Sequence, residues 1–339
     1  MCGVGEAFMN TSKHQPYLAL AEEMGERIKG LETWQIEKAG ATLEHAYYAV
    51  GRGGLTSIIA SAIDVALHDL RAKELGVPLH QLLGGAVRER VKAYASLARY
   101  KACGDVVKVV EHSLARGFKA VKIHQHGVDV LECAEVVRRE LGYGFELMAD
   151  LNASLSPGEA MRILPKLAKY ELAWVEEPIW PPEDYKALGE LSKRAEVPIA
   201  AGENEYTLYG FAKLIEEGGV LIIQPDIAKV GGLTKIKKIA ALAEALGAVV
   251  VPHSRPHSLW INIMAAVHFV STLSYESMVE VSPTPPRQEP FVKEVEISGG
   301  EIAVPNAPGI GVRDSGWTEL FPPKEGEVVD YHKRYTNTL

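Results

Sequence analysis

Eight short β-rich runs follow one another from about residue 91, and their regular spacing is the feature that most constrains the fold. Successive runs start 23 to 29 residues apart, and each gap holds one amphipathic stretch, such as DVVKVVEHSLARGF. Regular alternation of strand and helix predicts a parallel sheet covered by helices, and eight such units favour a closed (β/α)8 TIM-type barrel. The runs begin at Val91, Lys119, Phe145, Leu172, Val197, Val220, Ala248 and Ser277.

The alternative α/β fold, an open doubly wound sheet, requires a glycine-rich phosphate turn after an early strand. No G-x-G-x-x-G motif stands in that place. The stretch GRGG at Gly51 precedes a helical run but has no strand before it. We interpret it as a loop, with a phosphate site as the alternative.

The chain divides into three parts in this interpretation. Residues 1–86 form an α+β capping domain, 87–289 the catalytic barrel, and 290–339 a C-terminal segment that packs back on the cap. The first part contains a short GVGEAF strand, two helical stretches and the run IIASAIDVALHDLRAKELGVPLHQLLGG, which has apolar residues at helical spacing and predicts a core-packed helix. The last part, with GGEIAVPNAPGIGV, predicts turns and short strands.

Composition excludes several classes of partner. The 339 residues are 47% hydrophobic, enough for a large core, and the net charge of −8 argues against nucleic acid or an anionic membrane as main partner. No apolar run approaches the roughly 20 residues of a bilayer span. The three scattered cysteines predict no disulfide framework and favour a reducing cytoplasm. Only six asparagines and six glutamines occur, which indicates a heat-adapted source.

Polar residues stand at the ends of the predicted strands, from the second strand to the eighth. In a TIM-type barrel the active site lies at the carboxyl ends of the strands, so these side chains are the candidate site. In chain order they are Lys122 and His124, Asp150 and Asn152, Glu176 and Glu177, Glu203 and Asn204, Asp226, His253 and Glu280.

Three carboxylates from consecutive strands predict a metal site. Asp150, Glu176 and Glu203 end strands whose axes lie roughly 5 Å apart, so their oxygens can converge. Their mutual repulsion is relieved by a hard divalent cation, and an all-oxygen set suits Mg²⁺ better than Zn²⁺. The alternative is three solvated carboxylates that cap the following helices.

A carboxylate and an imidazole end two further neighbouring strands. Asp226 beside His253 would fix the ring tautomer and raise the pKa of the ring, which makes His253 a general base; the alternative is an ordinary histidine in a polar loop. Arg255 and His257 are interpreted as rim residues. Lys122 and His124 project to one face of the second strand, because alternate strand residues share a face. His126 lies past that strand and is interpreted as an ordinary loop residue.

The order and spacing of several motifs resemble the enolase superfamily, in its mandelate racemase and muconate lactonizing enzyme branch. The resemblance covers most of the chain, through GVGEA, ASAIDVALHDLRAKELGVPLHQLLGG, VEEP, AGEN, QPDIAKVGGLT, PHS and VPNAPGIGV. It implies a Mg²⁺-dependent enzyme that removes the proton α to a substrate carboxylate and stabilises the enediolate. It implies that Asp150, Glu176 and Glu203 are the metal ligands and that Asp226 and His253 are the catalytic dyad. Lys122 and His124, at the lysine-x-lysine positions, and Glu280 are the further catalytic groups that it implies. Asn152, Lys122 and Glu280 are the expected contacts of the substrate.

Within this resemblance dehydration of an acid sugar to a 2-keto-3-deoxy acid is favoured. A racemase, epimerase or cycloisomerase acting on a hydroxy acid or lactone is the first alternative, and a non-catalytic structural or binding barrel is the second. The resemblance also implies a homo-oligomer, either a dimer or an octamer.

Two departures from the family pattern bear on the substrate. The chain opens almost at GVGEA, so the cap is expected to be partly truncated and to lack a substrate-facing loop. His124 replaces the second lysine of the pair, which puts a group that titrates near neutrality where relatives carry a permanent charge.

Overall fold

The barrel predicted from the strand spacing is present. The computed structural model describes residues 1–9, 14–255, 258–284, 286–313 and 315–317. Parallel pairing runs from β7 down to β1, and β8 pairs with the other edge of β1. The strands are β1 (Arg90–Ser96), β2 (Ala120–His124), β3 (Glu146–Asp150), β4 (Leu172–Glu176), β5 (Ile199–Ala201), β6 (Ile222–Ile223), β7 (Val249–Val250) and β8 (Met278–Val281).

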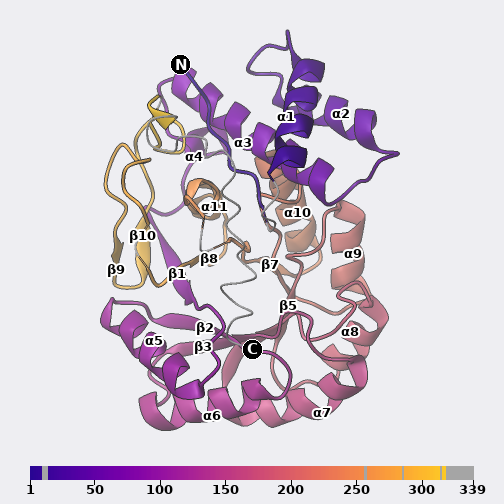
Figure 1. Cartoon of the computed structure of the whole chain (residues 1–339), viewed down its shortest axis with the longest axis vertical. Coiled ribbons are helices and arrows are strands. Elements are labelled where there is room, and N and C mark those ends of the chain that lie inside the picture. The colour runs from indigo at the N-terminus through magenta and orange to yellow at the C-terminus, as the bar shows by residue number, and fades with distance from the viewer. Residues whose placement is uncertain (10–13, 256–257, 285, 314, 318–339) are drawn as a thin grey trace.

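One helix follows each of the first seven barrel strands, and these helices surround the sheet (Figure 1). Sequence signals explain their ends: α7, for example, starts at a capping box in which Ser156 and Glu159 bond each other's backbone N–H groups. The helices are α5 (Cys103–Ala115), α6 (Asp129–Leu141), α7 (Pro157–Leu167), α8 (Tyr185–Ser192), α9 (Leu208–Glu216), α10 (Gly232–Ala245) and α11 (Ile261–Ser271).

The barrel interior below the candidate site is filled by side chains. Tyr94, Met148, Trp174 and Val251 are buried there, and the rings of Tyr94 and Trp174 meet edge to face. Inward positions of a small barrel are packed in layers, so the lumen is a core and not a pore. The polar strand ends therefore rest on a floor of buried, mostly apolar side chains.

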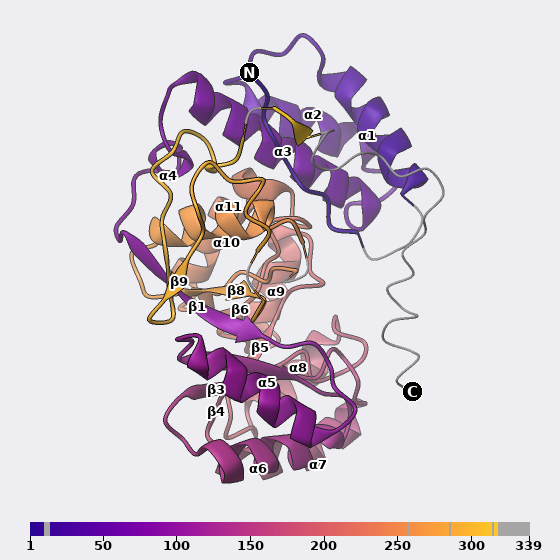
Figure 2. The same ribbon diagram turned by 60° about the vertical axis from the view of Figure 1, so that its left-hand side comes forward.

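The N-terminal part is a layer of helices over one side of the barrel (Figure 2). It contains α1 (Gln15–Ile28), α2 (Ile36–Tyr47), α3 (Leu55–Glu74) and α4 (Leu79–Leu82). The long apolar run predicted as one helix is two helices, because Gly76 has a left-handed backbone and Pro78 has no N–H to donate. The GRGG stretch is a loop that leads into α3.

The predicted GVGEAF strand is absent, and this expectation was wrong. Gly3 and Gly5 lie against α3, where a Cβ atom would meet the carbonyl oxygens of Ala66 and Ala62 at about 2 Å. The backbone bonds side chains in place of a partner strand, because the Asp69 carboxylate accepts the N–H of Val4 at 3.0 Å. Alternation alone does not say whether an extended segment finds a strand to pair with.

The C-terminal part returns to both the barrel and the helical layer. β9 (Ile297–Ser298) and β10 (Glu301–Ala303) form a ladder that continues antiparallel from β1 (Figure 1). Farther along, the N–H of Ile310 donates to Asp69 of α3 at 2.8 Å. Residues 318–339 of the predicted C-terminal segment lie outside the described residues, and the three-part division remains a prediction.

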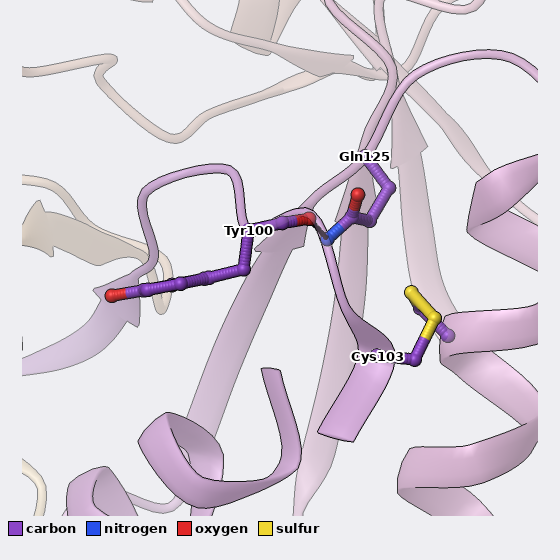
Figure 3. The surroundings of a disulfide bond; sticks show 4 residues. Tyr100, Cys103 and Gln125 are labelled. Carbon is purple, nitrogen blue, oxygen red and sulfur yellow. Dashed lines mark hydrogen bonds between the residues drawn. A yellow bond between two sulfur atoms is a disulfide. The ribbon is translucent and has the colours of Figure 1, made fainter. Parts of the chain in front are cut away.

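The expectation drawn from the cysteines was wrong for one pair, because Cys103 and Cys133 form a disulfide (Figure 3). Cys103 opens α5 and Cys133 lies in α6, and these helices are neighbours in the outer ring. Packing of these consecutive outer helices brings together residues 30 positions apart, which the linear spacing of cysteines does not reveal. In the described part of the chain, no helix is long and apolar enough to cross a bilayer.

Candidate active site

The strand register sets the predicted polar residues side by side. His124 pairs with Asp150, and Asp150 pairs with Glu176, so the last residues of β2, β3 and β4 lie at one level. Lys122 is one step deeper on the lumen side of β2, and Glu203 follows just after β5. Parallel strands end on the same rim of a barrel, and this is why residues far apart in sequence meet there.

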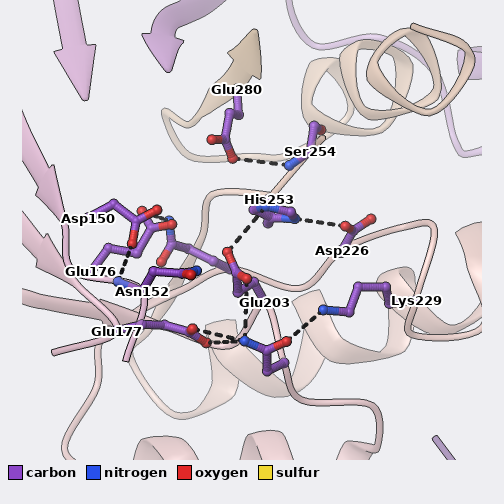
Figure 4. Close-up of polar contacts among 12 residues, drawn as sticks. Asp150, Asn152, Glu176, Glu177, Glu203, Asp226, Lys229, His253, Ser254 and Glu280 are labelled. Atoms are coloured by element: carbon purple, nitrogen blue, oxygen red, sulfur yellow. Dashed lines mark hydrogen bonds and ion pairs between the residues drawn. The ribbon is translucent and has the colours of Figure 1, made fainter. Parts of the chain in front are cut away.

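Three carboxylates converge as expected (Figure 4). One oxygen atom each of Asp150, Glu176 and Glu203 lies within 4.8 Å of the others, and all three residues are buried. Glu176 is fully inaccessible, and its Oε2 accepts hydrogen bonds from Trp174 Nε1 at 3.2 Å and Gln224 Nε2 at 2.6 Å. The two neutral donors orient this carboxylate without cancelling its charge.

Lys122 lies beneath the carboxylates and is only 1% exposed. Its Nζ is 2.6 Å from Glu176 Oε1, 2.9 Å from Glu280 Oε1 and 3.6 Å from Asp150 Oδ2. Burial alone would lower the pKa of Lys122, but these carboxylates outweigh burial and hold the pKa well above its usual range. Lys122 is therefore a permanent cation of the site.

Asp226 and His253 meet as the adjacent strand ends predict (Figure 4). His253 Nδ1 is 2.7 Å from Asp226 Oδ2, and Nε2 on the other side of the ring is 3.2 Å from Glu203 Oε2. Burial would lower the pKa of His253, but Glu203, Glu280 and Asp226 raise it to about 10. The ring stands between the dyad carboxylate and the three-carboxylate cluster.

The described part of the site holds fewer cations than carboxylates. Burial raises the pKa of Asp150 to about 6 and that of Glu176 to about 7, against the opposing charge of Lys122. These shifts indicate that protons are needed to relieve repulsion in the bare cluster. A divalent cation relieves it equally well, and an all-oxygen donor set suits Mg²⁺. The residues present therefore fit this metal.

Sequence reasoning missed a hydrogen-bonded chain beside the cluster (Figure 4). Lys229 Nζ donates to Asn204 Oδ1 at 2.9 Å, and Asn204 Nδ2 donates to both oxygens of Glu177, at 3.1 and 2.9 Å. Asn204 also reaches Glu203 Oε1 at 3.3 Å. Lys229 stands in the sequence QPDIAKVGG, where a lysine three residues after a strand-end aspartate was the only available signal.

The remaining predicted residues lie at the rim or the wall of the site. His124 Nδ1 is 4.0 Å from Asp150 Oδ2, and burial together with Lys122 lowers the pKa of His124 to about 4. Asn152 is exposed, and its backbone N–H donates to Asp150 Oδ1 at 2.7 Å. Glu280 accepts the N–H of Ser254 at 3.1 Å. His257 lies outside the described residues.

Two family models match the chain. The model for the "Mandelate racemase / muconate lactonizing enzyme, N-terminal domain" matches residues 1–84, and the "Enolase C-terminal domain-like" model matches residues 105–314. An L-rhamnonate dehydratase from Saccharopolyspora erythraea is 33% identical over 315 residues, which cover 87% of this chain and 76% of the relative.

Solved structures agree in fold over nearly the whole chain. The 3,6-anhydro-D-galactonate cycloisomerase from Zobellia galactanivorans has a TM-score of 0.85 and 32% identity, with 95% of this chain and 91% of that chain covered. An L-talarate dehydratase from Polaromonas sp. JS666, solved with Mg and L-glucarate, has a TM-score of 0.83 and 28% identity, with coverages of 94% and 88%.

A barrel whose rim gathers buried carboxylates, a buried lysine and an Asp–His pair has the layout of an enzyme that handles charge developing on a bound acid. With the family matches, the chain belongs to the enolase superfamily, in its mandelate racemase/muconate lactonizing enzyme branch.

Proposed function

We propose that this chain is a Mg²⁺-dependent acid-sugar dehydratase that converts a sugar acid into a 2-keto-3-deoxy acid. The observation that carries the proposal is the placement of two histidines on one carboxylate cluster. His253 Nε2 is 3.2 Å from Glu203, and His124 Nδ1 is 4.0 Å from Asp150. Elimination of water needs one group to take a proton and another to give one, and the two rings can fill both roles.

Asp150, Glu176 and Glu203 would hold the Mg²⁺ ion. When bound, the ion would lower the pKa of the α-proton, because it neutralises the charge that develops on the substrate carboxylate. Lys122 adds a fixed positive charge to the same region from the barrel floor. Glu280 and Asn152 remain proposed contacts of the substrate, Glu280 from the wall beside Lys122 and Asn152 from the rim.

The two histidines carry the proton transfers. One of them removes the proton from C2, and the other, in its protonated form, gives a proton to the hydroxyl leaving C3. The C3–O bond breaks and water departs, and the resulting enol loses the proton of its C2 hydroxyl and gains a solvent proton at C3 to become the ketone. Asp226 holds Nδ1 of His253, so Nε2 is the nitrogen that exchanges protons. The configuration of the substrate at C2 and C3 decides which histidine acts as base.

The printed names of relatives support both this reaction and one alternative. A dehydratase and a cycloisomerase are each about one third identical to the chain. Isomerisation requires the same removal of the α-proton but returns a proton without loss of water. The same pair of rings permits this outcome, so an isomerase is the second candidate.

A product screen tests the proposal. The full chain with Mg²⁺ is incubated with mono- and diacid sugars, and 2-keto-3-deoxy acids are measured by their carbonyl derivatives. We expect at least one acid sugar to give this product, and none to give it with EDTA. Exchange of the α-proton with D₂O without any keto product would replace dehydration by isomerisation.

Location and assembly are further parts of the proposal. We place the protein in the cytoplasm as a homo-oligomer, a dimer or an octamer. A disulfide is rare in that compartment except in heat-adapted organisms, and the low count of thermolabile amides agrees with such a source. Light scattering on the purified chain measures the assembly, and a monomeric mass would contradict it.

A further inference from the structure

A second group of polar side chains lies at the barrel rim, beyond His124 and apart from the carboxylates. Arg99 lies in the loop between β1 and α5, and His126 lies in the loop between β2 and α6. The Arg99 guanidinium contacts the His126 ring through Nη1, which is 2.8 Å from Nε2 and also contacts Nδ1. Both side chains are partly exposed, and Arg99 is near enough to His124 for its charge to help lower the pKa of that ring.

Arg99 differs from the other cations of the site. Lys122 is bonded to two glutamates, and Lys229 is bonded to Asn204. Among the described residues no carboxylate lies within 4.0 Å of the Arg99 guanidinium, although the barrel rim is rich in them. A guanidinium has five N–H donors, and one neutral ring can accept only one of them. Arg99 therefore keeps charge and donors for another acceptor.

The neighbouring His126 ring does not cancel this charge. Burial, assisted by Arg99, lowers the pKa of His126 to about 4, so the ring is neutral at neutral pH. Asp129, at the start of α6, opposes this shift in the pKa of His126 only weakly. A neutral imidazole can accept a hydrogen bond from Arg99 but carries no charge that would compensate the guanidinium.

The spacing between this pair and the carboxylate cluster indicates how long a ligand that reaches both would be. The rings of His126 and His124 are 5.9 Å apart, and His124 Nδ1 is 4.0 Å from Asp150. The terminal carbons of an extended six-carbon chain are roughly 6 Å apart, from ordinary C–C bond lengths. A sugar acid with C1 at the carboxylate cluster can therefore bring its far end toward Arg99.

The two loops that carry the pair are tied together at several points. Leu97 N donates to Lys122 O at 3.0 Å, and Gln125 Nε2 donates to Tyr100 O at 3.2 Å. The Cys103–Cys133 disulfide joins the helices that follow the two loops (Figure 3). A pair held in this way loses little freedom when a ligand binds, which favours affinity.

We propose that Arg99, with His126, binds the far carboxylate of the substrate, so that the preferred acid sugars are diacids. A planar guanidinium matches a carboxylate with two parallel hydrogen bonds, and the half-buried rim strengthens them. This inference rests on the proposed function and names the substrate class of the same site.

The test compares Arg99→Gln with Lys101→Gln, an exposed cation in the same loop. Values of kcat/KM are measured with Mg²⁺ for galactarate and glucarate and for the matching monoacids galactonate and gluconate. We expect the wild-type chain to have a higher kcat/KM for diacids than for monoacids. Arg99→Gln should reduce kcat/KM for diacids by about 10- to 100-fold and leave the value for monoacids nearly unchanged. Lys101→Gln should match the wild-type chain with both kinds of substrate.

An equal loss for diacids and monoacids would mean that Arg99 only supports the loop, and would overturn the inference, as would no loss at all. 6-Phosphogluconate distinguishes the kind of anion: if it is preferred over diacids and needs Arg99, the carboxylate assignment is wrong. If no acid sugar reacts, the proposed function fails. Calorimetric titration of the Mg²⁺-loaded protein with the same acids then still tests the role of Arg99. Tighter binding of diacids than of monoacids, lost in Arg99→Gln, would support this inference. Equal binding of the two kinds of acid would overturn it.

Discussion

At the scale of single residues, Lys122 and Glu176 are the centre of the site. Both are inaccessible to water, and their contact of 2.6 Å lies between the apolar floor of the barrel and the carboxylate cluster. Removing one member of a buried pair leaves the other charge without compensation, which costs about 3 to 5 kcal/mol. A substitution in this pair would therefore change the stability of the fold and the chemistry of the site at once, so its effect on activity could not be interpreted.

Glu203 is a better residue for testing the metal site. Glu203→Gln keeps the size of the side chain and an oxygen that can accept from Asn204, but removes one charge from the three-carboxylate cluster. We expect Mg²⁺ affinity to fall by about 10- to 100-fold. Isothermal titration of the folded variant with Mg²⁺ measures this.

Glu216→Gln provides the matched control, because Glu216 is an exposed carboxylate of α9 outside the site. It should bind Mg²⁺ as the wild-type chain does. Unchanged affinity in Glu203→Gln would remove Glu203 from the proposed ligands.

At the scale of elements, the residues at the strand ends could be predicted from the sequence, but the side chains that contact them could not. The spacing of β-rich runs predicted β1 to β8, and alternation within β2 predicted that Lys122 and His124 share a face. The partners Gln224 and Lys229 were missed, because pairing between side chains of different strands depends on rotamers and depth. The Arg99–His126 contact was missed because both residues lie in loops, where no strand or helix periodicity indicates which side chains meet.

The disulfide between α5 and α6 is expected to stabilise these two units. Closing a loop of 30 residues removes freedom from the unfolded chain, and such a bond contributes about 2 to 4 kcal/mol. The double variant Cys103→Ser/Cys133→Ser should unfold at a lower urea concentration, and a reductant should shift the wild-type chain in the same way. Cys2→Ser, which changes the exposed free cysteine, should have no effect.

A thiol count decides whether the bond is present. The denatured, unreduced wild-type chain should expose one reactive thiol. Three reactive thiols, or a urea midpoint that does not respond to reductant, would contradict the assignment.

His268 of α11 is expected to make stability fall as pH decreases. It is fully buried, accepts the N–H of His80 at 3.3 Å and donates to Ile310 O at 3.3 Å. Burial lowers the pKa of His268 to about 3, so below pH 6.5 the unfolded chain binds a proton that the folded chain does not. The free energy of unfolding should drop by about 1.4 kcal/mol per pH unit between pH 6.5 and pH 3.

Substitution by glutamine isolates this contribution. His268→Gln can keep both hydrogen bonds without titrating, so its stability should fall less from pH 7 to pH 5, by about 2 kcal/mol. His80, stacked on His268, also has a lowered pKa and remains in both proteins. Urea midpoints across this range, with the exposed His112→Gln as control, measure the difference, and parallel profiles would refute it.

At the scale of the whole molecule, separate parts of the chain pack around the barrel: the first residues at the rim, and the C-terminal ladder at the start of β1. The first residues cover the site, since the Phe8 ring lies 5.0 Å from Lys229 Nζ and 6.4 Å from the His253 ring. The C-terminal ladder extends β1, and the barrel supplies the polar residues. The sequence order predicted the barrel, because the repeat is periodic. It did not predict how the first residues bind α3, because that segment pairs with side chains.

The most direct test of the account follows the α-proton itself. Mono- and diacid sugars carrying deuterium at C2 are incubated with the full chain, and release of deuterium into water is measured by NMR. Release should require Mg²⁺, be lost with EDTA, and fall at least about 100-fold in Asp226→Asn, whose Mg²⁺ affinity should be unchanged. Failure to release deuterium from any acid sugar by a folded, Mg²⁺-loaded protein, or equal release with EDTA, would contradict the account.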